Sequence, residues 1–141
     1  MDRALAEWAE TRSIVETGDP LWGLLTYRLA RFAAAMAKED AAALPEYKRE
    51  LAEQLATSAT SIAANIAEGY SRSTVADRRR FYGYALGSAR EAVAWYAAVE
   101  NAPLPPDVVL TRVTILSRLR RLLFGMMKSS QSRRGGSLFE P

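Results

Sequence analysis

The sequence predicts an all-α protein that folds as an antiparallel, up-down-up-down four-helix bundle, preceded by a short extra N-terminal helix. Apolar residues recur at spacings of three and four along almost the whole chain, which is the period of an amphipathic helix. Alanine is abundant, and no Asn-Gly or Asp-Gly turn separates alternating segments, so hairpins are not indicated. Long helices with short connections pack most simply as neighbours that alternate in direction.

The 141 residues suit a single folded domain. We divide the chain into an N-terminal extension, a bundle and a tail that is rich in glycine and serine. The tail has no helical period and contains adjacent arginines, so we expect a flexible basic segment. The three parts cover, in order, residues 1–18, 19–130 and 131–141.

The limits of the bundle helices follow from caps and breakers. Asp19 before Pro20 is typical of a helix start, and Thr74 with Asp77 forms a variant capping box. Gly69 is placed to end the second helix as a left-handed cap. The expected long helices cover, in order, about residues 20–40, 45–68, 74–101 and 107–129.

The third helix carries two apolar stripes, one that begins at Phe81 and one that begins at Tyr82. Two stripes provide more apolar surface than a single bundle seam uses. Two interpretations remain open: the helix packs against a further partner such as another copy of the chain, or it is a fully buried central helix.

The composition excludes several kinds of catalytic chemistry. The chain has no cysteine and no histidine, which removes thiol nucleophiles, imidazole bases and most zinc or iron sites. Neither the GxGxxG nor the GxxxxGK[ST] phosphate-binding motif is present. We therefore expect no catalytic residues, no metal, no cofactor and no enzymatic activity.

No apolar run approaches the roughly 18 residues that a membrane helix needs. The first residues are charged throughout, unlike the apolar core of a signal peptide. We expect a cytoplasmic protein without membrane contact.

Charge is distributed unevenly along the chain, whose net charge is +3. Residues 1–68 hold 7 Lys and Arg against 11 Asp and Glu, a net charge of −4. Residues 69–141 hold 12 against 5, a net charge of +7. A basic half either covers solvated helix faces or binds a phosphate-rich partner. The candidate nucleic-acid-binding residues are Arg72, Arg78, Arg79, Arg80, Arg112, Arg118, Arg121 and Lys128.

We expect these cations to contact the phosphates of RNA or DNA without reading the base sequence. Aromatic residues rarely alternate with them on predicted exposed faces, so base stacking is not expected to dominate.

Asn65 interrupts the apolar stripe of the second helix. A buried amide costs several kcal/mol unless it is hydrogen-bonded, so Asn65 needs a partner. We expect the second and third helices to touch here, with Asn65 bonded to Ser88 or to a nearby backbone group. Gly87 would then permit the close approach of another backbone. Three charged residues would extend this network: Glu68, Arg72 and Glu91.

Two segments, SIAANIAEGYSR and RFYGYALGSAREA, carry a resemblance to a known family. They resemble the signature of the bacterial four-helix-bundle proteins encoded in intervening sequences of 23S ribosomal RNA genes. The resemblance implies a left-handed antiparallel bundle that assembles as a homopentamer. The matching residues are Ser61, Asn65, Ile66, Glu68, Gly69, Arg72, Phe81, Ala85, Gly87, Ser88 and Glu91.

A related branch is the accessory variability protein of diversity-generating retroelements, a basic pentameric barrel that binds nucleic acid and a reverse transcriptase. The chain departs from the usual family pattern at Arg78, where an aromatic residue is common, in its N-terminal extension, and in its basic tail. The expected function is therefore a non-enzymatic homopentamer that binds nucleic acid. The alternative is a protein-interaction scaffold or accessory subunit, for example for a reverse transcriptase.

Overall fold

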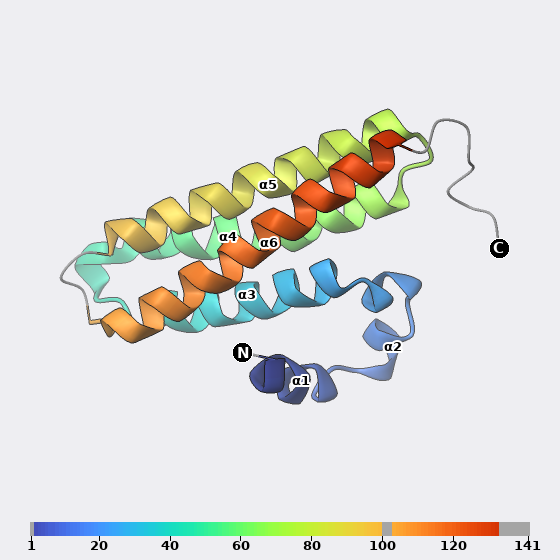
Figure 1. The fold of residues 1–141 in the computed structure, drawn as a ribbon. Helices are drawn as coiled ribbons and strands as arrows, with labels where there is room; N and C mark the ends of the chain where they lie inside the picture. Colours follow the sequence, from blue (N-terminus) through green and yellow to red (C-terminus); the bar gives the residue numbers. More distant parts are fainter. Residues whose placement is uncertain (1, 100–102, 133–141) are drawn as a thin grey trace.

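The computed structural model describes residues 2–99 and 103–132, with the helical backbone alone for residues 130–132. These residues form helices joined by short connections (Figure 1). The α-helices are α1 (Asp2–Glu10), α2 (Ile14–Thr17), α3 (Leu25–Ala42), α4 (Arg49–Ser71), α5 (Val75–Ala98) and α6 (Pro106–Ser132). Two 3-10 helices, Pro20–Gly23 and Glu46–Lys48, precede α3 and α4.

The four long helices pack antiparallel, so the predicted fold class is confirmed (Figure 1). Helix α4 contacts α3 and α5, α5 contacts α6, and α6 closes the ring against α3. Helix α1 lies outside the ring, against α3. Large aliphatic side chains of α3, α4 and α6 fill the centre, and α5 contributes mainly alanines and tyrosines. The most deeply buried large side chains are Leu29, Leu55, Ile62, Ile66, Ile115, Leu119 and Leu123.

Local capping signals predict several helix starts correctly. Thr74 Oγ1 accepts a hydrogen bond from the Asp77 amide at 3.2 Å and begins α5. Asp19 Oδ1 accepts from the Leu21 amide at 2.9 Å, but it caps a 3-10 turn. Leu24 is extended, with φ −81° and ψ 112°, so α3 begins only at Leu25.

Other helix limits differ from those expected. The N-terminal extension forms two helices because Ser13 Oγ accepts from the Glu16 amide at 3.3 Å and starts a new turn. Residues 131 and 132, predicted as part of the tail, extend α6. The rest of the predicted tail, and the predicted end of the third helix at residue 101, lie outside the described residues.

Gly69 does not end α4 as a left-handed cap, and that prediction is wrong. The helix continues through Ser71 and ends where Arg72 becomes extended, with φ −81° and ψ 144°. Gly69 is buried, and a Cβ atom there would lie 2.6 Å from Tyr82 Cε1 and 3.3 Å from the Arg78 carbonyl oxygen. The absence of a side chain at this position lets α4 and α5 approach closely.

The close approach predicted at Gly87 is absent. A Cβ atom at Gly87 would have no heavy atom within 4 Å outside its own helix, and the residue is exposed. The glycine that the contact between α4 and α5 requires is therefore Gly69, which lies against the Tyr82 ring of α5.

Both apolar stripes of α5 are used within the chain. The stripe that begins at Tyr82 is buried or half-buried, and the stripe that begins at Phe81 contains buried alanines. Since α5 lies between α4 and α6, each stripe has a helix to pack against. Both stripes therefore have partners within the chain, but α5 is not a fully buried helix, since Tyr84, Gly87 and Arg90 are exposed.

Replacing Gly69 with alanine should destabilise the fold by about 1–3 kcal/mol, because the added methyl group overlaps the buried Tyr82 ring. Replacing Gly87 with alanine should stabilise it by about 0.5–1 kcal/mol, because an exposed helical position gains propensity without a clash. Urea unfolding of the two single variants measures both effects. Equal shifts of the same sign would contradict the assignment of the close approach to Gly69.

Candidate nucleic-acid interface

The predicted contact between the helices of Asn65 and Ser88 is confirmed, with Ser61 as the residue that makes it. Ser61 Oγ on α4 donates to Ser88 Oγ on α5 at 2.6 Å. Asn65 is half-buried, and its Nδ2 donates to the Ser61 carbonyl oxygen at 2.9 Å. Of the two partners expected for Asn65, the structure therefore has the backbone group.

The charged residues expected around Asn65 make separate local contacts. Glu68 Oε2 and Arg72 Nη2 form an ion pair 3.0 Å long at the end of α4. Glu91 Oε1 accepts from Trp95 Nε1 at 3.2 Å on α5. Neither contact includes Asn65, so within the described residues the predicted wider network does not form.

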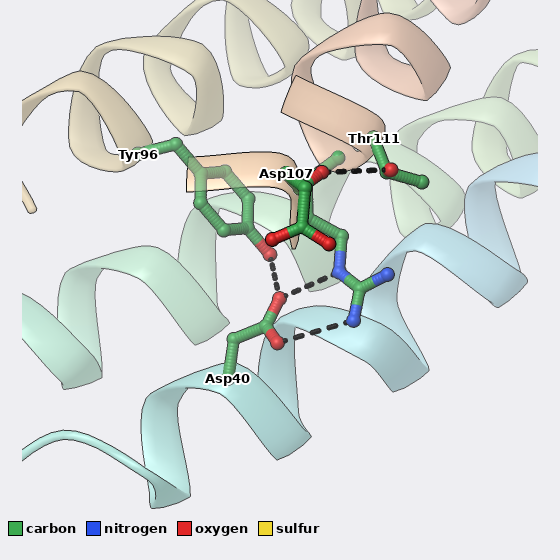
Figure 2. A network of polar contacts seen from close by, with 5 residues as sticks. Asp40, Tyr96, Asp107 and Thr111 are labelled. Carbon is green, nitrogen blue, oxygen red and sulfur yellow. Dashed lines mark hydrogen bonds and ion pairs between the residues drawn. The ribbon is translucent and has the colours of Figure 1, made fainter. Parts of the chain in front are cut away.

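Arg112, predicted to contact phosphate, instead holds a buried carboxylate inside the bundle (Figure 2). Asp40 on α3 is 5% exposed. Its Oδ2 accepts from Arg112 Nε at 2.8 Å and from the Tyr96 hydroxyl at 2.6 Å, and its Oδ1 accepts from Arg112 Nη2 at 3.2 Å. The three side chains join α3, α5 and α6 at one end of the bundle.

The same contacts perturb two titratable groups. Burial raises the pKa of the Tyr96 phenol, and its hydrogen bond to the Asp40 carboxylate raises that pKa further. Partial burial acts to lower the pKa of Arg112, but the hydrogen bonds and charge of Asp40 outweigh it, so the net shift is upward. Both shifts favour a neutral Tyr96 and a charged Arg112 around Asp40.

Arg78 also belongs to the fold rather than to an exposed surface. It is 7% exposed, and its Nε donates to the Arg72 carbonyl oxygen at 2.6 Å, at the end of α4. The arginine fills a buried site and satisfies a carbonyl that the helix end leaves without a partner.

Three further candidates are neutralised by carboxylates. Arg72 pairs with Glu68 as described, and Arg80 Nη2 lies 3.2 Å from Asp77 Oδ1. Arg118 Nη1 lies 3.0 Å from Asp2 Oδ1, which connects α6 to the N-terminal helix. Each of these ion pairs is close to neutral as a whole, so it attracts a phosphate less strongly than an arginine without a carboxylate partner does.

The remaining candidates have no ion pair with any described residue, and they share their helices with two cations that were not among those predicted. Arg90 and Arg120 lie across from each other and line a groove of about 90 Å³ between α5 and α6. We call these cations the α5/α6 basic face, which comprises Arg79, Arg90, Arg120, Arg121 and Lys128. Arg120 could have been recognised from the sequence, because it adjoins Arg121. The position of Arg90 across from Arg120 could not, because it depends on the register of the two helices.

Two aromatic side chains on α5 and α6 are more exposed than expected. Tyr84 is 53% exposed and Phe124 is 44% exposed. The Arg90 guanidinium lies 5.9 Å from the centre of the Phe124 ring. The Phe81 ring has the guanidinium of Arg72 at 4.7 Å and touches Tyr84 edge-on at 5.6 Å. Cations and aromatic rings are therefore closer neighbours on these helices than the sequence suggested.

Together these features define a helical-bundle protein in which five cations without an ion pair among the described residues lie on the two neighbouring helices α5 and α6. A family model described as 23S rRNA-intervening sequence protein matches residues 25–107, more than half of the chain. The chain therefore belongs to the 23S rRNA-intervening sequence protein family. Helices α1 and α2 and nearly all of α6 lie outside the matched residues.

A solved structure supports the same fold. It is a crystal structure of a protein with unknown function from the S23 ribosomal protein family of Bacteroides thetaiotaomicron. The two chains superpose with a TM-score of 0.68 and 20% sequence identity, over 74% of this chain and 99% of the other. At this identity the likeness concerns the fold alone. No curated protein matches the chain.

The described residues contain neither a membrane span nor a metal-binding cluster. None of the helices there is long and apolar enough to cross a membrane. No group of three or more acidic side chains in the same residues is arranged to hold a metal ion.

Replacing Arg112 with alanine should cost about 3 kcal/mol of unfolding free energy, because it leaves the buried Asp40 carboxylate without its cation. Arg121 is the matched control on the same helix, and its replacement should change stability by less than about 0.5 kcal/mol. Chemical denaturation compares the two. Similar small losses in both variants would show that Arg112 does not support the fold.

We expect the folded protein to lose stability at high pH because of the Tyr96 hydroxyl. Because the pKa of Tyr96 is raised in the folded state, its contribution is complete below about pH 10, the ordinary tyrosine pKa, and is lost as pH rises further. Thermal melts of the parent protein and of Tyr96→Phe between neutral and alkaline pH measure this. The variant should lose stability less steeply above about pH 10, and parallel curves would contradict the prediction.

Proposed function

We propose that the protein is a non-enzymatic, homopentameric nucleic-acid-binding protein that contacts phosphates through the α5/α6 basic face. The observation that carries the proposal is that the five cations of this face have no carboxylate partner among the described residues. Unpaired arginines and lysines are the groups that replace the counterions of a nucleic-acid backbone. The proposal places this activity in the cytoplasm.

The face is suited to phosphates rather than to base edges. Two of its cations, Arg90 and Arg120, line a shallow groove between α5 and α6. No single helix projects from the described bundle to enter a DNA groove. Contacts of this kind position a backbone without reading sequence. RNA and DNA are both included in the proposal because phosphates are common to them.

The homopentamer rests on the family resemblance. Five copies would present the basic face five times, so weak individual contacts would add along one strand. Light scattering at low salt, with and without a mixed RNA and DNA pool, measures the assembly and its gain in mass. A monomer in both conditions would overturn the pentamer.

A second candidate function is favoured by the exposed Tyr84 and Phe124 rings, which lie on the same two helices. Exposed aromatic residues are common at protein interfaces. The alternative is an accessory subunit that docks on a protein such as a reverse transcriptase, as the retroelement branch of the resemblance implies. A protein partner that remains bound after nuclease treatment would favour this alternative.

Neutralising the α5/α6 basic face should weaken nucleic-acid binding. The variant replaces Arg90, Arg120, Arg121 and Lys128 with glutamine. Its affinity at low salt should fall by at least about tenfold, and the slope of log affinity against log salt should become shallower by about 0.9 for each phosphate that the variant no longer neutralises. Fluorescence anisotropy with labelled RNA and DNA oligonucleotides measures both quantities.

Arg49→Gln is the control, because Arg49 is an exposed arginine on α4 that pairs with Glu46 and Glu53. It should leave affinity nearly unchanged. Absence of nucleic-acid binding by the parent protein at low salt would overturn the proposed function. An equal weakening of binding in both variants would show that the contact surface does not lie on α5 and α6.

A further inference from the structure

A second basic surface lies on the opposite side of the four-helix ring, where α3 and α4 meet the N-terminal extension. There the extension forms one wall of an open groove of about 360 Å³. The other wall is α3 and the floor is α4. This volume falls at the lower end of the range of about 300–1,000 Å³ that small-molecule sites occupy.

Three cations line this groove, and no acidic residue does. Arg31 and Lys38 lie two turns apart on one face of α3, and Arg12 faces them from the extension. Arg31 pairs with Glu16, whereas Lys38 and Arg12 have no ion pair among the described residues. The groove therefore carries a local positive charge within the acidic half of the chain.

Arg12 is held in place but incompletely satisfied. Its guanidinium lies 4.7 Å from the centre of the Trp8 ring, and its Nη2 donates to Thr11 Oγ1 at 2.9 Å. Its Nε is buried and has no hydrogen-bond partner among the described residues. A buried donor without an acceptor is costly, so the Arg12 side chain is held beside the groove without a full set of hydrogen bonds.

The rest of the lining is flat and apolar. Trp8 and Tyr27 contribute two aromatic rings. The floor presents only short side chains of α4: Thr60, Ala63, Ala64 and Ala67. Short side chains leave room for a planar group to lie on the helix, and the neighbouring rings favour stacking with such a group.

We propose that this groove binds a nucleotide unit, with its planar base on the floor beside Trp8 and Tyr27 and its phosphate at Arg12 and Lys38, the two cations of the groove that have no ion pair among the described residues. The charge selects an anion, and the aromatic and flat apolar lining selects one that carries a ring. Trp8 and Arg12 precede residue 25, where the family match begins. The site therefore depends on the extension of this chain, and it does not rest on the α5/α6 basic face.

Isothermal titration calorimetry at low salt tests the site with three probes: AMP, adenosine and inorganic phosphate. AMP should bind about tenfold more tightly than either of the others, because only AMP offers both the ring and the charge. AMP should also change the fluorescence of Trp8. Failure of AMP to bind, or binding of phosphate as tight as that of AMP, would overturn the proposal.

The double variant Arg12→Glu with Lys38→Glu reverses the two unpaired charges of the groove. Its affinity for AMP should fall by about tenfold or more, since each carboxylate repels the phosphate. The control is Arg49→Glu with Arg80→Glu, two exposed arginines that belong neither to the groove nor to the α5/α6 basic face, and it should bind AMP as the parent does. Thermal melts verify that both variants fold. Unchanged AMP binding by the groove variant would overturn the site.

Two further measurements identify the source of the nucleotide and exclude another occupant. If the groove variant also loses affinity for a short oligonucleotide, the bound unit belongs to a strand, and if it loses only AMP, the ligand is a free nucleotide. The groove could instead be an interface between copies of the chain. Two results together would show this and overturn the proposal: the groove variant has a changed mass in light scattering, and the parent protein does not bind AMP. If AMP binds but long RNA and DNA do not, only the proposed function fails.

Discussion

The arrangement of the helices depends on one buried charge. Asp40 is removed from water near the end of α3, and a lone carboxylate there would be very costly. Tyr96 and Arg112 both bind it, one from α5 and one from α6. Because both side chains must reach the same carboxylate, the register of α5 against α6 is fixed. That register places Arg90 beside Arg120, so the exposed basic groove is a geometric consequence of a contact inside the bundle.

The opposite end is fixed by contacts of a different kind. Arg78 closes the connection between α4 and α5 by binding a carbonyl oxygen, and Gly69 lets the Tyr82 ring lie directly against α4. Arg78 and Arg112, which the sequence suggests as surface cations, thus make contacts that hold the fold together. Without these two arginines the candidate surface is smaller. It keeps only cations for which the described chain provides no carboxylate.

What the sequence could predict follows the range of the interactions. The bundle and the cap at Thr74 depend on periodicity and on hydrogen bonds between near neighbours, and both are confirmed. The sequence points to Gly87 rather than Gly69 for the close approach, because the place where two helices touch depends on their register. It misleads at Arg112 for the same reason, since the partner of Arg112 lies 72 residues away. The groove beside Arg12 could not be predicted, because the docking of the extension is a tertiary contact that no local pattern encodes.

The uneven placement of charge also has a consequence for encounters in solution. The first 68 residues carry a net charge of −4 and the remainder +7, so each chain has a permanent electric dipole moment. A polyanion that comes within the Debye length of about 10 Å at 0.1 M salt experiences a torque as well as an attraction. The chain is therefore turned toward the polyanion before contact, and orientation is selected during diffusion. Added salt would therefore slow productive encounters as well as weaken the equilibrium affinity.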